Sequence, residues 1–158
     1  MVHNNLGTAY YGKGAWDKAI EEYKKAISLR PRYADAQSNL GAAYAGKGLI
    51  DEAIAAHKAA IAIKPDSPQA HLNLGVSYSR KGELDNAIEE FKSVVVLDAG
   101  SVTAHTYLAV AYYKQGNYRL AIEHCDRAAE LQGSANEDLI RLLAPYRAAA
   151  GTIKGMKQ

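Results

Sequence analysis

The sequence predicts an all-α solenoid of stacked helix pairs, and three observations lead to this fold class. A short motif recurs every 34 residues, as LGTAY at 6–10, LGAAY at 40–44, LGVSY at 74–78 and LAVAY at 108–112. The apolar residues between these motifs follow helical periodicity. The composition, 48% hydrophobic and 23% charged with 4 Pro in 158 residues, is typical of one folded domain.

Each repeat is predicted to consist of a helix, a turn and a second helix. In the first repeat Leu6, Gly7 and Tyr10 fall on one side of a helix. A glycine follows that helix and suits the left-handed residue that ends it. This glycine recurs as Gly14, Gly48, Gly82 and Gly116.

The second helix of each repeat is predicted to begin near an acid, since a negative charge stabilises a helix N-terminus. The acids in question are Asp17, Asp51 and Asp85. Pro31 and Pro65 then close the first two repeats. The four predicted repeats span 1–33, 34–67, 68–101 and 102–135.

The two ends of the array are predicted to differ. Residues 136–150 fit a single helix that caps the last repeat, which Pro145 is expected to kink or shorten, and 151–158 fit a flexible tail. The first helix has no predicted neighbour before it, so Val2, Leu6 and Tyr10 are expected to be uncovered. The resulting hypothesis is that the chain is part of a longer solenoid or stacks on another molecule.

These positions resemble the tetratricopeptide repeat (TPR) family over nearly the whole chain. The matching positions are the small residues Gly7, Gly41, Gly75 and Ala109, the tyrosines Tyr10, Tyr44, Tyr78 and Tyr112, and the alanines Ala19, Ala53, Ala87 and Ala121. At the aromatic position, Tyr23 and Phe91 fit but His57 and Cys125 depart, and Ala99 and Gly133 replace a proline. The resemblance implies a right-handed α-solenoid of four helix-turn-helix units plus a C-terminal capping helix, acting as a non-catalytic protein-binding scaffold without a cofactor.

The resemblance also implies that the first helix of each pair lines a concave groove, where a peptide would bind. The candidate peptide-binding residues on that face are Asn5, Asn39, Asn73, Tyr107, Asp35, Gln69, Arg80 and Lys114. A side-chain amide can pair with both the N–H and the C=O of a peptide bond, so three asparagines at one repeat position favour binding of an extended backbone. They resemble the asparagine ladder in the TPR region of O-GlcNAc transferases. The alternative is that asparagine is simply tolerated on a solvated helix face.

Other functions remain open at this stage. The carboxylate clamp with which some TPR domains bind heat-shock chaperones is not expected, because Asn4 and Thr8 stand where that clamp has lysine and asparagine. Two further hypotheses are a scaffold that self-associates through the uncovered first helix and a substrate-recruiting region of a larger enzyme. The fold alone does not choose among them.

Several function classes are disfavoured by composition and spacing. The net charge of +2 is spread along the chain, so nucleic acid is not an expected partner. No apolar run is long enough to enter a membrane and no signal peptide is recognisable, which predicts a cytoplasmic protein. The histidines His3, His71 and His105 lie one or two repeats apart, too far for one metal ion. No catalytic constellation is found, and Glu21 and Glu22 are expected on a solvated face.

Overall fold

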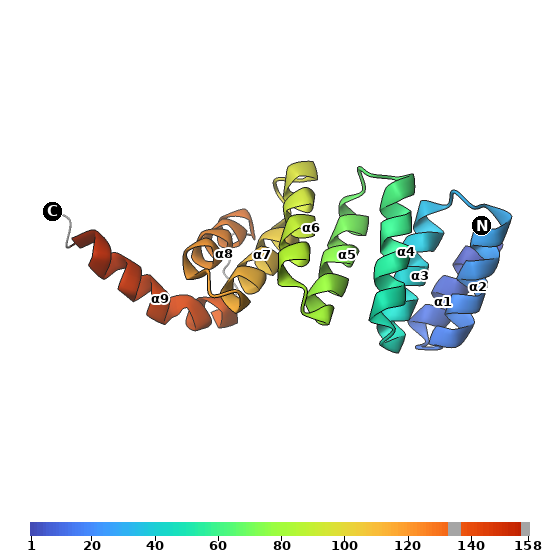
Figure 1. Ribbon diagram of the computed structural model, residues 1–158, viewed down its shortest axis with the longest axis horizontal. Helices are drawn as coiled ribbons and strands as arrows, with labels where there is room; N and C mark the ends of the chain where they lie inside the picture. Colours follow the sequence, from blue (N-terminus) through green and yellow to red (C-terminus); the bar gives the residue numbers. More distant parts are fainter. Residues whose placement is uncertain (133–136, 156–158) are drawn as a thin grey trace. The chain divides into compact units, whose positions relative to one another are not determined.

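The computed structural model describes residues 1–132 and 137–155, and their regular secondary structure is entirely α-helical (Figure 1). The chain divides into two compact units, one spanning Met1–Glu83 and one beginning at Leu84. Each unit consists of helices packed against their neighbours in sequence. Within the described residues, no helix combines the length and the apolar character that crossing a membrane requires.

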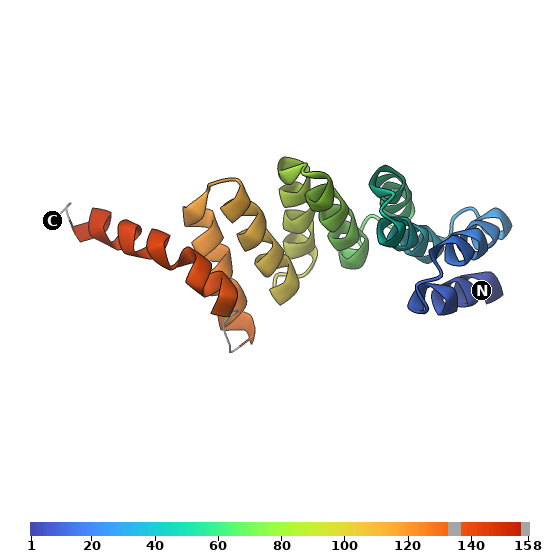
Figure 2. The ribbon, with the colours of Figure 1, turned by 90° about the horizontal axis from the view of Figure 1, so that it is seen from below.

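The first unit contains five helices that alternate between the two positions of a repeat. They are α1 (Val2–Gly12), α2 (Trp16–Leu29), α3 (Ala34–Lys47), α4 (Ile50–Ile63) and α5 (Pro68–Lys81). Helix α2 packs on both α1 and α3, and α4 packs on both α3 and α5. The first helices also touch one another, α1 with α3 and α3 with α5 (Figures 1 and 2). This side-by-side arrangement is the helix-pair stacking predicted for a solenoid.

The second unit contains α6 (Leu84–Leu97), α7 (Val102–Lys114), α8 (Tyr118–Gln132) and α9 (Glu137–Gly155). Helix α7 packs on α6 and α8, and the capping helix α9 packs on α8. Helix α9 is longer than predicted, because it runs through Pro145 and includes 151–155, which we expected in the tail. Residues 156–158 of the predicted tail, Gly133 and the predicted start of the capping helix at 136 lie outside the described residues.

A left-handed glycine separates the two helices of each repeat, as predicted. The φ angles are +69° at Gly14, +86° at Gly48, +86° at Gly82 and +80° at Gly116. An L-residue with a side chain is strained in this region, so glycine is favoured where the first helix must end and reverse. Within each unit, the turn therefore sets the antiparallel packing of the pair.

Small residues let the paired helices approach closely. A Cβ built on Gly7 would lie 2.6 Å from Cε1 of Tyr23, and one on Gly41 would lie 2.5 Å from Cε1 of His57. On the second helices of the same pairs, Ala19 and Ala53 are fully buried. The predicted role of these positions in close helix crossing is confirmed.

Candidate functional site

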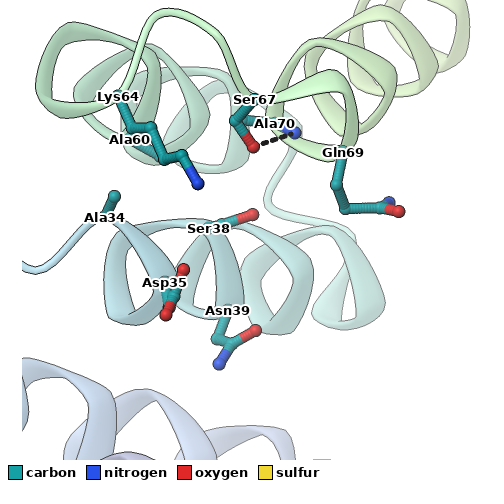
Figure 3. Close-up of a pocket in the computed structure, with 9 residues that line it drawn as sticks. All are labelled: Ala34, Asp35, Ser38, Asn39, Ala60, Lys64, Ser67, Gln69 and Ala70. Atoms are coloured by element: carbon teal, nitrogen blue, oxygen red, sulfur yellow. Dashed lines mark hydrogen bonds between the residues drawn. The ribbon is translucent and has the colours of Figure 1, made fainter. Parts of the chain in front are cut away.

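A pocket of about 200 Å³ with both polar and apolar lining lies between the first helices of the second and third repeats (Figure 3). Its lining residues are Ala34, Asp35, Ser38, Asn39, Ala60, Lys64, Ser67, Gln69 and Ala70. The pocket thus brings together three of the predicted peptide-binding residues, Asp35, Asn39 and Gln69. Lys64, which the repeat pattern of the sequence did not indicate, follows α4 and extends toward α3 in Figure 3.

The asparagine side chains in this region connect successive first helices. Asn39 Nδ2 donates a hydrogen bond to Asn4 Oδ1 at 3.1 Å, and Asn73 Nδ2 donates to Ser38 Oγ at 3.2 Å. Each bond joins an asparagine to the preceding repeat, and both asparagines are half-buried. The amides are therefore held in fixed orientations between helices, and they are not freely solvated.

The start of α5 positions two of the site residues. Ser67 caps the helix, with its Oγ accepting from the backbone N–H of Ala70 at 3.3 Å, and Pro68 occupies the first turn, where its missing N–H has no cost. Gln69 follows in the same turn, and Asn73 lies one turn later on the same face. Gln69 Nε2 donates to Asn73 Oδ1 at 2.8 Å, so the two amides orient each other.

The other predicted peptide-binding residues lie outside this pocket. Asn5 is exposed on α1, and Arg80 donates from its guanidinium to the carbonyl oxygen of Ala45 at 2.7 Å. In the second unit, Tyr107 stacks on Phe91 with ring centroids 5.1 Å apart, and Lys114 is exposed at the end of α7. Arg80 and Tyr107 therefore make internal contacts that the sequence pattern did not predict.

The expectation that Glu22 lies on a solvated face is wrong, because Glu22 is buried. His3 Nδ1 lies 2.6 Å from Glu22 Oε2, and Lys25 Nζ donates to Glu22 Oε1 at 2.9 Å. These two partners, His3 first, lower the pKa of the Glu22 carboxyl group. The pair links α1 to α2 within one repeat, across a separation of 19 residues that a search for i, i+4 partners does not detect.

A second pair with the same separation occurs in the fourth repeat, where His105 Nδ1 lies 2.9 Å from His124 Nδ1. The two imidazoles border a pocket of about 320 Å³ between α7 and α8. Burial lowers the pKa of both histidines, and the charge of His105 adds to the effect on His124. In the described part of the chain, no three His, Cys, Asp or Glu side chains gather in a way that could hold a metal ion.

Comparison with known proteins identifies the repeats. A family model for the TPR repeat matches residues 7–48, 46–82 and 77–116, and one for the tetratricopeptide repeat matches 102–134. No curated protein matches the chain in sequence.

Among solved structures, one of MamA is 30% identical over 83% of this chain and 77% of its own, with a TM-score of 0.80. MamA from Desulfovibrio magneticus RS-1 is 25% identical over 82% and 73%, with a TM-score of 0.77. The first TPR of Spaghetti (RPAP3), solved with the HSP90 peptide SRMEEVD, is 21% identical over 73% and 91%, with a TM-score of 0.71, and this likeness shows the fold alone. Since the family models cover most of the chain, the protein belongs to the tetratricopeptide repeat family.

Proposed function

We propose that the chain is a non-catalytic scaffold that binds an extended peptide or partner segment along its first helices, with Asn39 and Asn73 as central contacts. Tetratricopeptide repeats mediate protein–protein interaction and are usually non-catalytic. Affinity in this mode comes from many modest contacts to a backbone that keeps its extended form.

The side-chain amides of Asn39 and Asn73 are anchored, yet each keeps a hydrogen-bonding group that no described residue uses, and this observation supports the proposal. Asn39 uses one N–H on Asn4, and within the described residues its Oδ1 accepts no hydrogen bond. Asn73 uses one N–H on Ser38 and its oxygen on Gln69, which leaves its second N–H. An amide already held in place loses less side-chain entropy when it binds a peptide.

The charges at the pocket favour a peptide of mixed polarity. Asp35 and Lys64 both line it, and neither forms an ion pair with another described residue. A peptide N–H or basic side chain can approach Asp35, while a carboxylate can approach Lys64. We do not propose that the chain binds a heat-shock peptide like the one bound to RPAP3. The two positions that hold lysine and asparagine in the carboxylate clamp are Asn4 and Thr8 in this chain. Asn4 is buried, and Thr8 Oγ1 donates to the Asn4 carbonyl oxygen at 3.0 Å.

The test compares two alanine variants that break the same internal hydrogen bond. Peptides selected from a random display library on the full chain are measured by fluorescence anisotropy against wild type, Asn39→Ala and Asn4→Ala. Both variants lose the Asn39–Asn4 bond, at a cost of about 1 kcal/mol in folding stability, but only Asn39→Ala removes the amide that faces the peptide. We expect Asn39→Ala to weaken binding about tenfold, and Asn4→Ala, which keeps the Asn39 amide but removes its anchor, to weaken it by no more than about threefold.

A second measurement tests whether the peptide backbone is what is bound. N-methylation of the central amides of the selected peptide should weaken binding more than alanine substitution of its side chains, because an amide ladder contacts N–H and C=O groups. Equal affinities for Asn39→Ala and Asn4→Ala, or indifference to N-methylation, would refute the proposed contacts.

A further inference from the structure

Three side-chain donors lie in the pocket between α3 and α5, and no described residue accepts a hydrogen bond from them. Lys64 lines the pocket and forms no ion pair or hydrogen bond with another described residue. In Figure 3 its side chain extends into the space between α3 and the turn that precedes α5, where the side chains of Ser38 and Ser67 also lie. We call these three residues the donor cluster.

The two serine hydroxyls of the donor cluster are held in place by bonds that they accept. Ser38 Oγ accepts from Asn73 Nδ2 at 3.2 Å, and Ser67 Oγ accepts from the backbone N–H of Ala70 at 3.3 Å. A hydroxyl has one O–H to donate besides its lone pairs, and in the described part of the chain neither O–H meets an acceptor. Both serines are half-buried, so each O–H is a positioned donor that an incoming acceptor can use.

The charge of the lining favours one kind of acceptor. Among the described residues that line the pocket, Lys64 is the one cation and Asp35 is the one acid. In Figure 3 Asp35 lies beside Asn39, on the side of α3 away from Lys64. A singly charged carboxylate matches one ammonium group and two hydroxyls, whereas a phosphate dianion would carry a charge that Lys64 alone does not balance and that Asp35 repels.

The asparagines beside the donor cluster indicate that the carboxylate belongs to a side chain. Asn39 lines the same pocket, and Asn73 donates to Ser38 of the donor cluster. A peptide backbone that contacts both amides runs past the pocket and continues beyond it. It would therefore present a side chain to Lys64, and not its C-terminus.

We propose that the donor cluster binds the side-chain carboxylate of an aspartate or glutamate in the extended peptide, and so selects an acidic residue at one peptide position. This subsite presupposes the peptide binding proposed for the first helices. The asparagines contact the backbone whatever its sequence, and the donor cluster adds the sequence preference. Because Lys64 is exposed, the charge pair contributes a modest share of the affinity.

The test uses peptides selected from a random display library on the full chain, synthesised with a free and with an amidated C-terminus and measured by fluorescence anisotropy. We expect the selected peptides to share an Asp or Glu, and its replacement by Asn or Gln to weaken binding about fivefold. On Lys64→Met the same replacement should change the affinity by less than about twofold, because the partner of the carboxylate is gone. Lys13→Met, which removes an exposed cation outside the pocket, should keep the full effect.

A second pair of variants tests the sign of the charge effect. Asp35→Asn removes the acid of the pocket, so it should strengthen binding of the acidic peptide by about twofold. Glu52→Gln makes the same charge change at an exposed position of α4 outside the lining, and it should leave the affinity unchanged.

Several results would overturn the proposal. Selected peptides without a shared acidic residue, or an equal loss on wild type and on Lys64→Met, would exclude the subsite and leave the backbone contacts of Asn39 and Asn73 standing. Tighter binding of a phosphoserine peptide than of the aspartate peptide would assign the donor cluster to a phosphate, and loss of binding on amidation would assign it to a chain terminus. Failure to select any peptide would overturn the peptide groove and the subsite together.

Discussion

The ring of His57 lies directly against the backbone of Gly41, so closely that a Cβ on this glycine would be 2.5 Å from Cε1 and 2.6 Å from Nδ1 of the imidazole. His57 is itself 1% exposed, so its ring has no solvent-filled space into which to move. The contact joins α3 to α4, and it explains why the second repeat has glycine at this position.

Gly41→Ala should therefore destabilise the protein by about 1–3 kcal/mol through overpacking. Gly12→Ala is the matched control, because nothing lies within 4 Å of a Cβ at that position. It should leave stability unchanged or raise it by up to about 1 kcal/mol. Urea unfolding of both variants measures the difference, and equal stability of the two would contradict the packing argument.

Burial of His57 should make the stability of the protein depend on pH. Burial disfavours the charged imidazole and lowers its pKa from 6.5 to about 4. Below pH 6.5 the imidazole of His57 is protonated in the unfolded chain but stays neutral in the folded chain. The contribution of His57 to the free energy of unfolding is therefore fully present above this pH and is lost as the pH drops toward 4. At about 1.36 kcal/mol per pKa unit, the full loss is about 3 kcal/mol.

His57→Phe tests this assignment, because Phe91 already fills the same position of the third repeat. The variant removes the buried Nδ1, which has no hydrogen-bond partner among the described residues. Urea unfolding of both proteins between pH 7 and pH 4.5 should give curves that diverge as the pH falls, with the wild type losing more stability. Parallel curves would mean that His57 is not the titrating group.

The pair formed by His105 and His124 should titrate as a coupled unit. Their Nδ1 atoms are 2.9 Å apart, so one donates and the other accepts, and two protonated rings would repel. Burial first, and then the charge of His105, lower the pKa of His124. In His105→Gln the NMR titration of His124 should move to higher pH, and an unchanged midpoint would argue against coupling.

Arg147 should hold the capping helix over Cys125. Its guanidinium makes two hydrogen bonds to the Asp126 carboxylate, and Cys125, on α8, is 3% exposed with a pKa raised by burial. Arg147→Ala should loosen α9 and raise the rate at which a thiol reagent labels Cys125 by about tenfold, which corresponds to about 1.4 kcal/mol of local opening.

Arg141→Ala is the control for this variant, since the exposed Arg141–Glu137 pair lies within α9 itself. Its labelling rate should match that of the wild type. If Arg147→Ala also labels at the wild-type rate, other contacts hold the helix, such as the stacking of Tyr146 on Tyr118 at a centroid distance of 3.5 Å.

The sequence determined the architecture because helix pairing is encoded locally and repeated. Each helix pair needs a left-handed residue at its turn, such as Gly48, and a small residue where its helices cross, such as Gly41. Both features recur in all four repeats at a spacing of 34 residues. The sequence also predicted that Asp35 and Asn39 share one side of a helix, since they lie four positions apart, and both line the same pocket in the structure.

Only the tertiary structure decided what these side chains contact. The sequence placed Asn39 on a solvated groove wall, but its partner Asn4 lies 35 residues earlier, at a separation that depends on how one repeat docks on the next. Glu22 likewise became a buried partner of His3 because α1 crosses α2 there. Periodicity specifies the direction of a side chain from its own helix, whereas burial and pairing depend on the distance and angle between helices, which are set by how neighbouring helices pack.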